Sequence, residues 1–71
     1  MIDENEYERA KIFFDRGKLV HISKINGIFL NGKIVEVNPR FVIINDKELG
    51  HQVVFFSELQ KELEEYRNNG R

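Results

Sequence analysis

Apolar positions in the first part of the chain recur with a helical period. Three of them share one face at spacings of three and four residues, Tyr7, Ala10 and Phe14, and Phe13 lies close by. Asp3 is a suitable N-cap, with Glu6 three residues on as in a capping box. Gly17 suits the left-handed position that ends a helix. The pattern predicts a helix over residues 4–16.

Between residues 18 and 56 the helical period gives way to β-branched and aromatic runs separated by turn signals. Four strands are predicted, over residues 18–25, 28–37, 41–44 and 51–56. Asn26-Gly27 predicts a tight hairpin with a type I′ turn, in which both residues have positive φ. Gly32 lies near the middle of the longest run, so we expect a bend or a close backbone approach there.

The last part of the chain returns to a helical spacing. Ser57 with Gln60 has the form of a second capping box. Leu59, Leu63 and Tyr66 then recur on one helical face. This pattern predicts a C-terminal helix over residues 58–67 that packs its apolar face on the sheet or on another subunit.

Length and composition restrict the class of protein. A chain of 71 residues fits one domain and buries only roughly 60% of the surface of its unfolded form. The sequence has no cysteine, which excludes disulfides and thiolate zinc sites and favours a reducing compartment. The acidic start does not read as a signal peptide, and no apolar run reaches the roughly 20 residues of a membrane span. We therefore expect a cytoplasmic protein with no membrane partner.

The charge distribution says more than the net charge of −1. Residues 1–15 carry five acids and two bases, residues 16–47 carry six bases and two acids, and residues 48–71 carry five acids and three bases. A basic middle between acidic flanks is compatible with an electrostatic footprint for nucleic acid. It is equally compatible with helices at both ends that are simply rich in solvated glutamate.

Residues arranged for catalysis are missing from the sequence. His21 and His51 are isolated from each other and lack partners at metal-ligand spacing. No nucleophile motif and no glycine-rich phosphate loop occur. We expect no enzyme activity, no metal and no cofactor.

One constellation of residues resembles a known family. Glycine and apolar residues recur at a fixed spacing: Gly27, Leu30, Gly32, Ile34 and Val37. Asn38, the run Phe41-Val42-Ile43-Ile44 and the run Gln52-Val53-Val54-Phe55 follow. Over about residues 7–59 the chain resembles the Sm-like family of small β-barrels, which includes the LSm and Hfq-like proteins. The resemblance implies a mainly β fold, a small bent SH3-like or Sm-like barrel with an N-terminal and a C-terminal α-helix, in one domain over residues 1–71.

The resemblance also implies an RNA-binding module that acts by base stacking and phosphate contacts, with single-stranded RNA as partner. Six candidate residues combine the aromatic faces, cations and turn position that this requires: Asn38, Arg40, Phe41, Lys24, Lys33 and Phe29. Phe56-Ser57 stands where the Hfq-like pattern has Lys-His and the archaeal and eukaryotic pattern has Arg-Gly. The alternative is an interaction or assembly module of the same fold that has lost RNA binding. Homo-oligomers would form through the fourth strand or the C-terminal helix.

Overall fold

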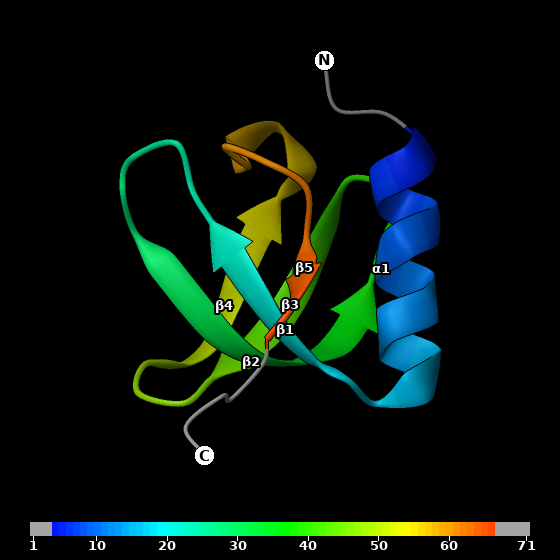
Figure 1. The fold of residues 1–71 in the computed structure, drawn as a ribbon, viewed down its shortest axis with the longest axis horizontal. Coiled ribbons are helices and arrows are strands. Elements are labelled where there is room, and N and C mark those ends of the chain that lie inside the picture. Colours follow the sequence, from blue (N-terminus) through cyan, green and yellow to red (C-terminus); the bar gives the residue numbers. More distant parts are fainter. Residues whose placement is uncertain (1–3, 67–71) are drawn as a thin grey trace.

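A computed structural model describes residues 4–66, which form one helix and a five-stranded antiparallel sheet (Figure 1). The elements in chain order are α1 (Glu4–Arg16), β1 (Leu19–Ser23), β2 (Phe29–Val37), β3 (Phe41–Asp46), β4 (Gly50–Phe55), the 3-10 helix η1 (Phe56–Glu58) and β5 (Glu64–Glu65). The strand order is β4-β3-β2-β1-β5, so the last strand lies beside the first. The predicted mainly β class and N-terminal helix are confirmed.

Helix α1 has the predicted bounds, and its C-terminal end explains why. Gly17 has φ 63°, and the N–H groups of Gly17 and Lys18 donate to the carbonyls of Phe14 and Phe13. These are the two bonds of a Schellman motif, which needs a residue at positive φ. The expected cap, Asp3, lies outside the described residues. Within them, the helix is neither long nor apolar enough to cross a membrane.

The hairpin between β1 and β2 forms where Asn26-Gly27 predicts it, but the turn type differs. The N–H of Gly27 donates to the carbonyl of Lys24 at 2.9 Å, and only Gly27 has positive φ in this turn, at 91°. Because Asn26 does not have positive φ, the type I′ prediction is wrong. The arrangement is that of a type I turn followed by a left-handed glycine, which makes a three-residue hairpin loop.

Gly32 in β2 lies close against the backbone of β3. A Cβ built on this glycine would collide with the carbonyl oxygen of Asn45 and would lie 2.7 Å from the carbonyl carbon of that residue. The expected close approach at Gly32 is therefore confirmed. The pairing register shifts further along the strand, between Ile34 and Glu36, where Val35 is the extra residue of a bulge.

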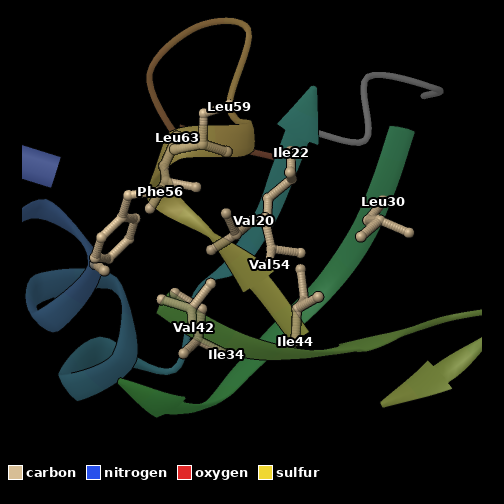
Figure 2. Packing of buried hydrophobic residues seen from close by; sticks show 11 residues of the cluster. Val20, Ile22, Leu30, Ile34, Val42, Ile44, Val54, Phe56, Leu59 and Leu63 are labelled. Atoms are coloured by element: carbon tan, nitrogen blue, oxygen red, sulfur yellow. The ribbon is translucent and has the colours of Figure 1, made fainter. Parts of the chain in front are cut away.

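Alternating residues of the strands build the core on one face of the sheet (Figure 2). The buried cluster comprises Ala10, Val20, Ile22, Leu30, Ile34, Val42, Ile44, Val54, Phe56, Leu59 and Leu63. Helix α1 lies against β2 and adds Ala10, while Tyr7 and Phe13 pack at the margin. Phe14 is exposed, so it does not belong to the buried face as predicted. The opposite, outer face of the sheet carries the residues between the core positions.

The C-terminal helix predicted over residues 58–67 is wrong for residues 58–66, and residue 67 lies outside the described part. After η1 the chain bends at residues 60 and 61 and then returns beside β1 to the short strand β5. The N–H of Gln60 donates to the carbonyl of Ser23, and the N–H of Tyr66 donates to the carbonyl of Leu19, each at 2.8 Å. Leu59 and Leu63 are buried as expected, but they lie in a non-helical segment. A spacing of four residues fits both arrangements.

Candidate nucleic-acid interface

The turn between β2 and β3 is organised by Asn38. Its backbone N–H donates to the carbonyl of Phe41 at 2.8 Å and its carbonyl accepts from the N–H of Phe41 at 3.2 Å. The side-chain Oδ1 accepts from the N–H of Arg40 at 3.0 Å. Pro39 suits the position after Asn38 because proline has no backbone N–H and the hydrogen bonds of this turn require none from it. Asn38 therefore positions its neighbours, and its Oδ1 already has a partner.

Arg40 and Phe41 follow this turn, Arg40 as an exposed cation and Phe41 as a partly exposed ring at the start of β3. Arg40 is exposed, and within residues 4–66 no carboxylate lies at ion-pair distance from it. Phe41 is half-buried and meets Phe55 of β4 edge to face, with ring centroids 5.3 Å apart and planes at 61°. Phe55 is 43% exposed. These four residues, Asn38, Arg40, Phe41 and Phe55, are called the turn group below.

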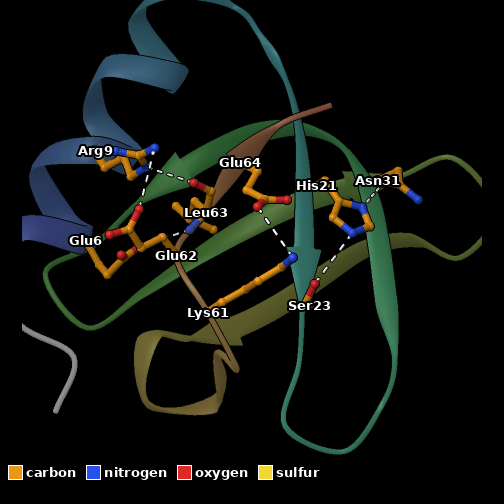
Figure 3. A network of polar contacts seen from close by, with 9 residues as sticks. All are labelled: Glu6, Arg9, His21, Ser23, Asn31, Lys61, Glu62, Leu63 and Glu64. Carbon is orange, nitrogen blue, oxygen red and sulfur yellow. Dashed lines mark hydrogen bonds and ion pairs between the residues drawn. The ribbon is translucent and has the colours of Figure 1, made fainter. Parts of the chain in front are cut away.

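A second aromatic pair lies on the β1–β2 hairpin. Phe29 is 59% exposed, the most exposed phenylalanine of the described residues, and it stacks on His21 at 5.5 Å with planes at 29°. Nδ1 of His21 donates to Oδ1 of Asn31 at 2.6 Å, and its Nε2 lies 3.5 Å from the Ser23 hydroxyl (Figure 3). His21, Phe29 and Asn31 form the hairpin group. The imidazole is held by hydrogen bonds, so the surface under the Phe29 ring is fixed.

The row Ser23–His21–Asn31 has the order of a nucleophile, a base and an orienting group. Its geometry does not favour catalysis, because Ser23 is only 3% exposed and a substrate could not reach the hydroxyl. A hydroxyl–imidazole distance of 3.5 Å is also at the long limit of a hydrogen bond. The row is better understood as the support of the hairpin group.

The two candidate lysines differ. Lys33 is exposed on β2, between Leu19 of β1 and Asn45 of β3, and has no ion-pair partner in the described chain. Lys24 has a side chain only 19% exposed, and its Nζ lies 3.1 Å from Oε1 of Glu58. A phosphate would have to displace that carboxylate. The role of Lys24 in RNA binding stays a prediction, and Lys33 is the better placed cation.

The six candidate residues do not form one cluster. Phe29 starts β2 and Asn38 follows its end, so the hairpin group and the turn group are separated by roughly 26 Å along a nine-residue strand. Lys33 lies between them. The sequence predicts Phe29 and Phe41 as aromatic faces, but it does not predict that His21 stacks on Phe29. The two-residue turn expected at Asn26-Gly27 would set Lys24 opposite Phe29. The three-residue loop instead sets Ser23 opposite Phe29 and brings His21 near, so the predicted register did not indicate this pair.

A small pocket of about 230 Å³ lies at the tip of the β1–β2 hairpin, lined by Lys24, Ile25, Asn26, Ser57 and Glu58. The N–H of Ile25 donates to the carbonyl of Glu58 at 2.8 Å, so backbone and ion pair together join the hairpin tip to η1. The charged groups of the pocket already pair with each other. It therefore offers a nucleotide less than the two aromatic groups do.

Asp46 and Glu48 lie at the connection between β3 and β4, and their carboxylates do not form a cation site. Both oxygens of Asp46 accept backbone hydrogen bonds, Oδ1 from Asn31 and Oδ2 from Glu48 and Leu49. These bonds, with that from Asn31 as the largest cause, lower the pKa of Asp46 below its ordinary value. Among residues 4–66 no cluster of His, Asp and Glu side chains could hold a metal ion.

No protein-family model matches the sequence, and no curated protein matches it either.

Proposed function

We propose that this protein binds single-stranded RNA on the outer face of its sheet, by base stacking and phosphate contacts and without catalysis. The observation that carries the proposal is Arg40, an exposed cation with no carboxylate partner in the described chain, which comes immediately before Phe41 of the Phe41–Phe55 pair in the sequence. Sequence-tolerant binding of single strands combines aromatic faces for the bases with cations for the backbone. The turn group contains both.

The hairpin group extends the same surface. Its exposed ring, Phe29, has one face stacked on His21 and the other available to a base. Lys33 lies on β2 between the two groups, where it could meet the backbone of a strand that crosses from one ring to the other. This surface carries few unpaired cations, chiefly Arg40 and Lys33. We therefore expect RNA to bind with modest affinity, little preference among bases and strong dependence on salt.

We further propose that the chain is a divergent member of the Sm-like small β-barrels. An N-terminal helix followed by an antiparallel sheet, with the last strand beside the first, supports this assignment. The close approach at Gly32 supports it too, because a strand shared by two sides of a small barrel must bend where a side chain would collide. A sequence without cysteine is compatible with a cytoplasmic setting.

A protein-interaction module of the same fold is the second candidate, and it has an observation of its own. Val53 is 49% exposed on β4 beside the 43% exposed Phe55. Ile43 of β3 pairs with Val53 across the strands and continues this apolar surface. Apolar surface of this kind suits a protein partner better than a phosphate backbone.

Fluorescence anisotropy with a short labelled RNA tests the proposal. The unmodified protein should retain both uridine-rich and adenine-rich single strands at low salt, with similar affinities that fall as salt rises. A single strand should compete better than a duplex of equal length, because paired bases offer no free faces for stacking. Failure to retain either RNA at low salt would contradict the proposal and leave the interaction module as the better account.

A further inference from the structure

Strand β4 is an open edge of the sheet. It has six residues, pairs with β3 on one side and ends the strand order on the other. Native edges are commonly protected by charges, proline, bulges or very short strands. The β4 sequence Gly-His-Gln-Val-Val-Phe has no lysine, acid or proline, and its pairing with β3 continues without a register shift from Phe55 to Gly50.

The hydrogen bonds of the neighbouring turn show which groups of β4 point outward. Phe41 exchanges both of its backbone hydrogen bonds with Asn38, so its polar backbone groups point toward β2. Since backbone direction alternates along an antiparallel strand, Val42 and Ile44 point toward β4 and bond to Val54 and Gln52. The N–H and C=O groups of His51, Val53 and Phe55 therefore point away from the sheet.

We infer that this edge binds a second copy of the chain, strand β4 against strand β4, antiparallel about a two-fold axis at Val53. In this register the outward groups of Val53 meet those of its own copy, and His51 meets Phe55 in both directions. The outward groups of all three residues then have partners. A shift by two residues in either direction leaves some of them without one.

Charge and side-chain chemistry favour a second copy. Val53 packs against Val53 at the axis and the imidazole of His51 packs against the ring of Phe55, so no acid or lysine opposes a like charge within the strands. The other edge, β5, consists of two exposed glutamates, Glu64 and Glu65. Their carboxylates pair with Lys61 and Lys18, and a strand of two residues offers a second copy fewer backbone groups than β4 does. An isologous dimer closes on itself and removes the β4 edge.

Hydrogen exchange of the unmodified protein tests the alternation directly. In dilute solution the amides of His51, Val53 and Phe55 should exchange quickly and those of Gln52 and Val54 slowly. At high concentration the first three should become protected as the sedimentation mass doubles. A protein that stays monomeric at every concentration, or that forms assemblies of more than two copies, would overturn the inference.

Charge pairing at position 53 tests the axis. Val53→Lys and Val53→Glu should each weaken self-association at least about tenfold, because like charges then face each other. Mixing the two variants should restore a dimer with one copy of each, since only a two-fold at this residue sets Lys against Glu. Val35→Lys, at a similarly exposed position of β2 inside the sheet, is the matched control and should dimerise normally. A mixture that fails to pair while both variants remain folded would overturn the axis. If either variant unfolds, the exchange pattern of the unmodified protein decides.

Discussion

The carboxylate of Glu6 accepts a hydrogen bond at 3.3 Å from the backbone N–H of Leu63, a residue near the other end of the chain (Figure 3). The carbonyl of Leu63 accepts a second bond at 2.7 Å from Nε of Arg9. Helix α1 thus holds both polar backbone groups of one buried residue. The two bonds fix the extended segment that replaces the predicted C-terminal helix.

Glu6→Ala should lower the free energy of unfolding by about 1–3 kcal/mol, because the N–H of Leu63 loses its partner in a buried position. Glu6→Gln keeps an acceptor oxygen and should lose less. Urea unfolding followed by circular dichroism gives both values. Glu8→Ala, which removes an exposed acid paired with Lys11 on the same helix, is the control and should change stability by less than about 0.5 kcal/mol. Equal stability of Glu6→Ala and the control would contradict the role of Glu6.

Gly32→Ala tests the close approach between β2 and β3. The added methyl group would meet the backbone carbonyl of Asn45. A Cβ is fixed by its own backbone and the carbonyl by that of β3, so neither group can rotate away. We expect a loss of about 1–3 kcal/mol or more, as in overpacked cores. Lys33→Ala, one residue further on the same strand and exposed, should stay within about 0.5 kcal/mol of the parent in the same urea titration. A Gly32→Ala protein as stable as Lys33→Ala would show that the two strands separate easily.

Asp46 predicts how stability changes in acid. Three backbone N–H groups favour its ionised form, so its folded pKa lies below the ordinary value of 3.8. A lowered folded pKa adds stability above the unfolded pKa, and this stability is lost as the pH falls through the folded value. Asp46→Asn should therefore be less stable than the parent at pH 7, and the difference should shrink below about pH 4. Thermal unfolding between pH 2 and 7 checks the convergence, and parallel curves for the two proteins would contradict it.

The sequence predicts those features that local chemistry decides. Helix α1 has the expected bounds because an apolar face and Gly17 determine it within a few turns. The four central strands lie where their runs and turns predict, within two residues at every end. The C-terminal segment fails because Leu59 and Leu63 can be buried either by a helix or by pairing along β1, and the long-range bonds of Ser23 and Glu6 decide for the second.

The candidate site shows the same division. Arg40 beside Phe41 follows from adjacency in the sequence, and Phe55 joins them through the β3–β4 register. The ion pair of Lys24 with Glu58 depends on where η1 lies against the hairpin tip, which no local pattern encodes. The bulge at Val35 likewise becomes visible only in the pairing of β2 with β3.

Arg40→Ala is the sharpest test of RNA binding at the turn group. Because the guanidinium has no ion-pair partner in residues 4–66, its loss should leave folding unchanged and act on the ligand alone. If it contacts a phosphate, affinity should fall for uridine-rich and adenine-rich strands alike, and the salt slope should decrease by about one unit. Arg16→Ala removes the same charge from the exposed end of α1 and is the matched control. Anisotropy titrations at several salt concentrations compare the two, and equal slopes for both variants would place the RNA contact elsewhere on the protein.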